Sequence, residues 1–446
     1  MAGAANKHKM SGRLAAFVRQ HRAALVVMAL LLVVRLMALY SLGFTYSIES
    51  DDLAYVESGI RFAQTGSITM HTEYPSAQIM PGLTVLIGLF SLVFGEGKLL
   101  WVALKLLWIV MGVCTAWYIY RCVSLFVPQW CGVLAMLPLF RADFIWMDNL
   151  ILTETPFMLA LTAMVYYTLC MGRTPGYRYF WPCAAAYMAG LMCKANIALY
   201  PLFALVYLLV VKYDRKLLAR QCVVLAGIVL CFVVPWSIRN YVQFHAFVPL
   251  TYGAGNPTLL GTYQGIGYPE DESLDYQVNV AQPVREQYAA YYDEETGEVL
   301  PEYETYVSLQ RDGVKARYRQ QVWWDTDYKT LLYSYGVLKP QLMMERVFYW
   351  DTVFDQPKET MELAQRIDLC LCIAALAAAF ILKRHRKPIL FLTAVYLGNL
   401  YIYAMTFAFE RYNASMMSLR FIMGGIGIAL ILSLIRRGMR TLPEET

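Results

Sequence analysis

The chain has 446 residues, of which 58% are hydrophobic and only 16% are charged, and its mean hydropathy is +0.43. Soluble domains of ordinary composition do not reach these values, so they exclude a soluble protein and predict an α-helical polytopic membrane protein. The net charge is +5, and the charged residues are unevenly distributed, with short basic clusters beside hydrophobic runs. This pattern indicates membrane topology and not nucleic-acid binding.

The first hydrophobic run covers residues 23–42 and follows several basic residues, the last of which is Arg22. A run of about 20 residues is long enough to span a bilayer, so we interpret it as an uncleaved anchor and not as a signal peptide. The positive-inside rule then places the N-terminus in the cytoplasm and the next loop outside the membrane.

This loop carries two adjacent carboxylates, Asp51 and Asp52, at the start of the stretch 50–66. Apolar residues at 53, 56, 60 and 63 predict an amphipathic helix that lies along the membrane face. The acidic pair has two interpretations: ordinary first-turn acids of a helix with Ser50 as N-cap, or catalytic carboxylates. The apolar run 81–94 is short for a span and is predicted as a second juxtamembrane helix.

Later spans are predicted from apolar length and basic ends, which gives about ten spans with both termini in the cytoplasm. The stretch 181–211 is interrupted by polar residues and Pro201, so it is predicted as two short helices. Pro235 is expected to end the helix before it. The remaining spans are predicted at 99–120, 130–146, 153–171, 217–234, 367–382, 389–409 and 416–435.

Three regions follow from this topology: an N-terminal transmembrane module, 1–236, whose first loop is 44–97; an extracytoplasmic region, 237–364; and C-terminal transmembrane helices, 365–446. The middle region is too long for an unstructured loop and is predicted as a small α or α/β unit. It is rich in tyrosines, which either stack on sugars or form its core. They include Tyr288, Tyr291, Tyr292, Tyr303 and Tyr306.

No cofactor is expected from the sequence. All ten cysteines lie in or beside hydrophobic segments, which argues against a disulfide framework or zinc site outside the membrane. The chain has no HExxH, P-loop or GxSxG motif. A divalent metal is not predicted; if one binds, Asp51 and Asp52 are the candidate ligands, although neighbouring residues of one helix point in different directions.

Ionisable residues from distant segments collect at the predicted outer membrane face. Such groups are costly near hydrocarbon, so their convergence indicates a site, whereas each one alone is equally explained by pairing or snorkelling. A carboxylate there can take a proton from a hydroxyl, and Arg or Lys can hold a phosphate leaving group. An ion-coupled transporter would use the same inventory. The residues are Asp51, Asp52, Glu57, Arg61, Glu73, Asp148, Glu154, Lys194, Arg239, Glu410 and Arg411.

Several motifs occur in a fixed order along the chain. Asp51 is followed four residues later by Tyr55, and the amphipathic stretch ends at Gly66. Further motifs are the proline-led run 81–95, LTETPF at 152–157, PWSIRNY at 235–241 with the glycine-rich 253–256, and Arg411 followed by Tyr412. Together they resemble the motifs of GT-C glycosyltransferases, in particular the protein O-mannosyltransferase and aminoarabinose transferase group.

The resemblance implies roles for individual residues. Asp51 would be the general base and Glu154 a second acidic residue near the reaction centre. Lys194 and Arg239 would contact the lipid phosphate, as would Arg61 and Arg411. The supporting residues would be Asp52, Tyr55 and Asp148. Pro81 stands alone where the family has a proline-rich pair, and 413–415 replace a proline usual after Arg-Tyr; both departures concern the acceptor and local geometry.

The predicted function is therefore an inverting glycosyltransferase at the outer face of the cytoplasmic membrane. Its partners would be a polyprenyl-phosphate sugar donor, membrane lipids and a hydroxyl acceptor on a lipid, glycan or protein. The alternatives are a lipid-linked oligosaccharide polymerase or ligase, a flippase-type transporter, or a membrane scaffold. The sequence shows no inverted repeat of the transporter kind.

Overall fold

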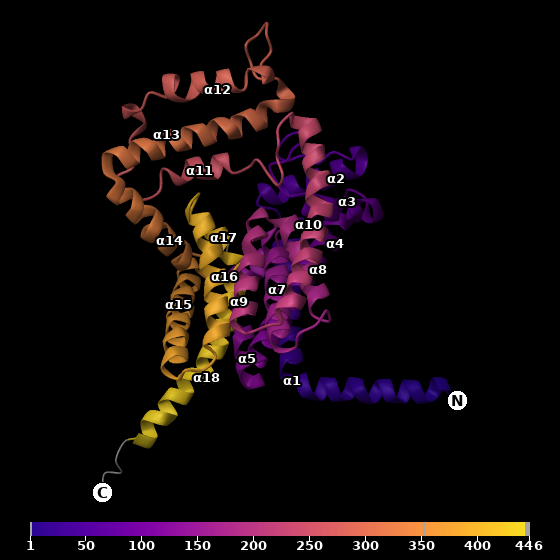
Figure 1. Ribbon diagram of the computed structural model, residues 1–446. Helices are drawn as coiled ribbons and strands as arrows, with labels where there is room; N and C mark the ends of the chain where they lie inside the picture. The colour runs from indigo at the N-terminus through magenta and orange to yellow at the C-terminus, as the bar shows by residue number, and fades with distance from the viewer. Residues whose placement is uncertain (1, 351–352, 442–446) are drawn as a thin grey trace.

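The computed structural model describes residues 2–350 and 353–441. These residues are almost entirely helical, and the one isolated β-bridge joins Tyr292 and Val299. Figure 1 shows an upright helical bundle with both termini at one end and a layer of helices lying across the other end. The predicted polytopic α-helical fold is confirmed, and the middle region is helical rather than α/β in its described part.

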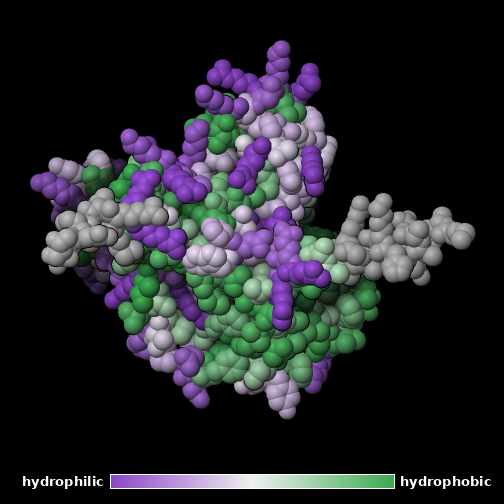
Figure 2. Space-filling view, turned by 90° about the horizontal axis from the view of Figure 1, so that it is seen from below, coloured by the Kyte–Doolittle hydropathy of each residue, from purple (hydrophilic) through white to green (hydrophobic). Residues whose placement is uncertain are grey.

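Six helices of the described residues are long and apolar enough to cross a membrane. They are Ala15–Leu42 within α1 (Ala2–Leu42), α4 (Lys98–Ser124), α7 (Glu154–Arg173), α10 (Arg215–Phe244), α15 (Lys358–Ile381), and Met417–Arg437 within α18 (Met417–Thr441). The end of the bundle that carries the termini shows broad hydrophobic surfaces interrupted by hydrophilic residues (Figure 2). The chain is therefore a multi-pass membrane protein.

The other predicted spans correspond to shorter or interrupted helices, so the count of about ten stays a prediction. They are α5 (Gln129–Met136), η1 (Leu137–Phe140) and α6 (Ala142–Met147), then α8 (Phe180–Cys193), α9 (Tyr200–Val210) and α16 (Arg386–Ala404). The predicted break within 181–211 is confirmed, because η2 (Ala195–Leu199) separates α8 from α9.

The expectation that Pro235 ends a helix is wrong, because α10 continues through it to Phe244. A proline inside a helix removes one backbone hydrogen bond, and tertiary contacts beyond Pro235 offset this loss. Trp236 donates to the carbonyl of Leu250 at 2.7 Å, and Asn240 donates to that of Val248 at 2.8 Å. The predicted divisions at 236 and 364 thus fall inside α10 and α15.

The two predicted juxtamembrane helices are present as α2 (Asp51–Thr65) and α3 (Gly82–Phe94). Gly66 ends α2 in the left-handed conformation, with φ of +76°, which favours glycine. The two helices pack closely because Gly59 and Gly88 face each other's helix. A Cβ on Gly59 would overlap Ile87, and one on Gly88 would lie 3.0 Å from the carbonyl oxygen of Gly59.

The helices α11 (Gly255–Gly261), α12 (Gln282–Gln287) and α13 (Glu304–Tyr333) form the layer across the bundle, and α14 (Lys339–Glu345) descends from it toward α15 (Figure 1). We call residues 253–345 the cap. Its core is aromatic: Tyr306 is buried and stacks on Phe244, with ring centroids 5.7 Å apart. The other four tyrosines named above pack in the same cluster. This supports the core interpretation of these side chains.

Candidate active site

A cavity of about 470 Å³ lies where the bundle meets the cap. Its walls come from the start of α2, the start of α7, the turn between α8 and η2, the end of α16 and the short helix α17 (Glu410–Ala414), with Gly253 and Ala254 from the cap. Five residues predicted from the sequence line this one cavity: Asp51, Tyr55, Glu154, Lys194 and Arg411.

A chain of ion pairs joins the charged members of this set. Arg411 Nη1 lies 2.5 Å from Asp51 Oδ2, and its Nε lies 2.8 Å from Glu154 Oε1. Lys194 Nζ lies 2.7 Å from the same Glu154 oxygen. The Glu154 side chain is fully buried, and a buried charge is tolerated only when it is paired and hydrogen-bonded. Two cations therefore share this carboxylate.

Asp51 also has a partner on its other side. His71 Nε2 lies 3.0 Å from Asp51 Oδ1, and His71 stands in the loop between α2 and α3 with φ of +58°. Burial raises the pKa of Asp51, but the hydrogen bond from His71 and the charge of Arg411 outweigh it and hold this pKa well below its ordinary value. The hydrogen bond to Asp51 in turn raises the pKa of His71.

His71 was not singled out by the sequence. No sequence motif or residue spacing marks His71. The one feature that could have indicated it is its position between two predicted interfacial helices.

Residues 78–238 match the family model of dolichyl-phosphate-mannose-protein mannosyltransferases. Among solved structures, the archaeal oligosaccharyltransferase AglB from Archaeoglobus fulgidus, in complex with an inhibitory peptide and a dolichol-phosphate, aligns over 96% of this chain. The TM-score is 0.56 and the sequence identity 14%, and the alignment covers 52% of AglB. The chain thus spans about half the length of that protein.

A further structure of the A. fulgidus oligosaccharyltransferase, tethered with an acceptor peptide, aligns with a TM-score of 0.52 and 12% identity, over 96% of this chain and 52% of that one. ArnT from Cupriavidus metallidurans bound to undecaprenyl phosphate aligns over 95% of this chain and 81% of its own, with 15% identity and a TM-score of 0.42. No curated protein matches the chain. The family match and the fold support a GT-C glycosyltransferase.

The predicted resemblance is thereby confirmed at the level of the GT-C superfamily. The family match contains Glu154 and Lys194 but neither Asp51 nor Arg411, which lie outside residues 78–238. The four residues meet only in the folded chain, so their roles are argued from geometry.

Two predicted donor-binding residues do not line the cavity. Arg239 Nη1 donates to the carbonyl of Ser76 and to Asn240 Oδ1, each at 3.0 Å. Arg61 Nη2 lies 3.5 Å from Glu73 Oε1 on the outer surface. Their contact with the donor phosphate stays a prediction.

Two predicted supporting acids also lie away from the cavity. Asp52 is fully buried and accepts hydrogen bonds from the backbone N–H groups of Ile48 and Ser50, at 3.0 and 3.3 Å. It therefore caps the start of α2, where Ser50 makes no side-chain capping bond. Asp148 is buried in the bundle, where it pairs with Arg35 at 2.6 Å.

No set of three or more His, Cys, Asp or Glu side chains in the described part of the chain is arranged to hold a metal ion. Asp51 and Asp52 contact different partners, as their adjacent positions on one helix predict. Whether the enzyme requires a metal stays a prediction.

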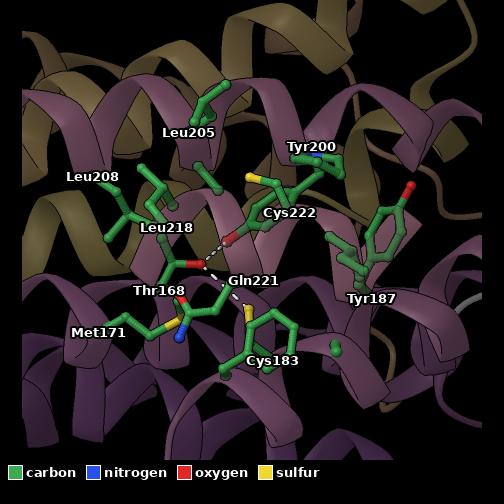
Figure 3. Close-up of a pocket in the computed structure, with 15 residues that line it drawn as sticks. Thr168, Met171, Cys183, Tyr187, Tyr200, Leu205, Leu208, Leu218, Gln221 and Cys222 are labelled. Atoms are coloured by element: carbon green, nitrogen blue, oxygen red, sulfur yellow. Dashed lines mark hydrogen bonds between the residues drawn. The ribbon is translucent and has the colours of Figure 1, made fainter. Parts of the chain in front are cut away.

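A second, apolar cavity of about 70 Å³ lies among α7, α8, α9 and α10. Figure 3 shows aliphatic side chains such as Leu205 and Leu208 around it, with Thr168 hydrogen-bonded to Tyr200 at 2.8 Å. Helices α8 and α9 flank both this cavity and the turn that carries Lys194. The apolar cavity and the charged cavity thus lie along the same helix pair.

Proposed function

We propose that the protein transfers a sugar from a polyprenyl-phosphate carrier to a hydroxyl acceptor, with inversion at the anomeric carbon, at the outer face of the cytoplasmic membrane. The observation that carries this proposal is the contact of Asp51 with Arg411 inside a cavity that also holds Lys194. A carboxylate base and two phosphate-binding cations thus face one space. The family match to dolichyl-phosphate-mannose-dependent enzymes supports the donor class.

In the proposed reaction, the acceptor oxygen forms a bond to the anomeric carbon while its proton passes to Asp51. The bond between that carbon and the phosphate oxygen breaks, and its electron pair stays on the phosphate. Lys194 and Arg411 stabilise the charge that develops there. Glu154 holds both cations toward the cavity, at 2.7 and 2.8 Å, and thereby orients them before the donor arrives.

The carrier's isoprenoid tail would lie among the spans. The apolar cavity between α8, α9 and α10 supports this placement, because it begins on the helices that flank Lys194 (Figure 3).

The test is to incubate purified protein with polyprenyl-phosphate sugars, with and without chelator, and to follow donor loss by mass spectrometry. Asp51→Asn keeps the size of the side chain but removes the base, so transfer should fall at least about 100-fold. Asp325→Asn is a matched control, since Asp325 is exposed in the cap, where its carboxylate accepts hydrogen bonds from Gln321. Near-normal turnover of Asp51→Asn, at normal expression and membrane insertion, would contradict the role of Asp51 as the general base.

A further inference from the structure

A polar groove of about 420 Å³ lies along the outer side of α2, between this helix and the loop that follows it. The groove is separate from the charged cavity and is not used by the reaction described so far. It is lined chiefly by polar side chains: Glu57, Arg61, Gln64, His71, Thr72 and Glu73. Glu57, Arg61 and Gln64 stand at i, i+4 and i+7 of α2, so they share one face of the helix.

The opposite wall of the groove is held in place by hydrogen bonds. Ser58 Oγ donates to the carbonyl of Thr69 at 2.6 Å, and the N–H of Thr69 points back to the same oxygen at 3.2 Å. The N–H of Ser76 closes the loop by donating to the carbonyl of Ile68 at 2.7 Å. The groove is therefore preformed rather than a gap between mobile segments.

Asp51 lines the charged cavity and contacts residues of both spaces. Its Oδ2 contacts Arg411, which lines the cavity, and its Oδ1 contacts His71, which lines the groove. One oxygen of Asp51 thus pairs with a residue of the cavity, and the other pairs with a residue of the groove. This position suits a base that serves a hydroxyl attacking from the side opposite the leaving phosphate.

We propose that this groove binds the acceptor, and that the acceptor is a hydroxyl-rich carbohydrate; the inference rests on the proposed function. Each sugar hydroxyl both donates and accepts hydrogen bonds. The groove matches this with acceptor-only carboxylates, a donor-only guanidinium, an amide and a hydroxyl. An isoprenoid or an apolar peptide segment would cover these polar groups without offering them hydrogen-bond partners.

Within this site His71 is a positioning residue. The hydroxyl at the inner end of the groove forms its bond to the anomeric carbon and gives its proton to Asp51, while the phosphate leaves with the electron pair. Arg411, held toward the cavity by Glu154, exchanges its contact with Asp51 for one with that phosphate as charge develops. The bond from His71 keeps the Asp51 carboxylate in place meanwhile, because it holds the oxygen that Arg411 does not.

The test uses the full chain in detergent with soluble trisaccharides of glucose, mannose and N-acetylglucosamine. Saturation-transfer NMR measures their binding without donor, and a serine- and threonine-containing peptide is the competing probe. Glu57→Gln and Gln64→Ala should weaken binding of the best trisaccharide about tenfold, as expected for one or two lost hydrogen bonds. Glu294→Gln, an exposed cap residue outside the groove, is the matched control and should bind as the wild type does.

With donor present, the groove variants should raise the acceptor KM, whereas Glu294→Gln should leave both the acceptor KM and the rate of donor hydrolysis without acceptor unchanged. His71→Ala should lower kcat with little change in acceptor KM, and His71→Gln, which keeps a donor for Asp51, should restore part of it. Wild-type protein that binds no trisaccharide, or that transfers only to the peptide, would overturn the carbohydrate site. Intact donor in the presence of a bound trisaccharide would instead contradict the proposed function alone.

Discussion

At the scale of single residues, Arg411 is the group on which the candidate site depends, because it contacts Asp51 and Glu154 at once. A guanidinium has five N–H groups in a planar fork, so two carboxylate contacts leave donors for a phosphate. A lysine at this position would offer a single point of charge and would not span the two acids. The cavity is thus electrostatically balanced before any donor enters, which is what burial of Glu154 demands.

The contact between His71 and Asp51 should make stability depend on pH. The pKa of His71 is raised in the folded state. The contribution of this contact to the free energy of unfolding is therefore fully present below the unfolded-state pKa of about 6.5, and it is lost as the pH rises through the folded-state pKa. Both side chains are partly exposed, so the contribution is at most about 1 kcal/mol. His71→Gln should therefore lower the Tm in detergent more at pH 5.5 than at pH 8.5.

Gln287→Ala, which removes no titrating group at an exposed position of α12, is the control for this prediction. Its effect on Tm should be the same at both pH values. A His71→Gln effect that is equal at pH 5.5 and 8.5 would contradict the ion pair.

The sequence identified most of the cavity but could not orient each side chain. Asp51, Glu154 and Lys194 stand at ends or breaks of hydrophobic runs, which is where ionisable groups of a membrane site occur. Arg239 satisfies the same criterion, yet its guanidinium is directed to the carbonyl of Ser76. Position along a span does not fix the direction of a side chain, which depends on neighbours that are distant in sequence.

At the scale of elements, local patterns located helices well and their ends less well. Periodicity predicted α2, and short apolar length predicted α3 as a helix that does not span. The prediction that Pro235 ends its helix was wrong, because the contacts of Trp236 and Asn240 with the following segment maintain α10 beyond the proline. These contacts are tertiary, so no local propensity contains them.

The close crossing of α2 and α3 gives a prediction at this scale. Gly59→Ala places a methyl group into Ile87 and within 3.1 Å of the backbone nitrogen of Gly88, so the helices must separate. Overpacking of this kind costs about 1–3 kcal/mol, and α2 carries Asp51. We expect a lower Tm and reduced sugar transfer, both measured on purified protein.

Gly227→Ala makes the same chemical change in α10, where no atom lies within 4 Å of the new Cβ. It should be neutral or stabilise the helix by up to about 1 kcal/mol. If the two variants unfold at the same temperature, the glycine crossing does not set the position of α2.

At the scale of the whole molecule, the cap and the bundle meet beside the candidate site. Gln264 makes a reciprocal pair with the backbone of Ala408: its amide donates to the carbonyl at 3.2 Å, and its oxygen accepts from the N–H at 2.7 Å. Lys339 of the cap donates to the carbonyl of Thr406 at 2.8 Å. Both contacts fall just before Arg411, so docking of the cap is coupled to the segment that holds the bridging guanidinium.

Gln264→Ala should therefore loosen the cap without unfolding the bundle. The loss of two hydrogen bonds should lower the free energy of local opening by about 1–3 kcal/mol. Amide hydrogen exchange in residues 255–264 and 405–409 should therefore be at least roughly tenfold faster than in the wild type. Gln287→Ala, at an exposed position of α12, is the control and should leave exchange there unchanged. Because Gly253 and Ala254 of the cap also line the cavity, the loosened variant should transfer sugar more slowly. Unaltered exchange around Ala408 would show that other contacts dock the cap.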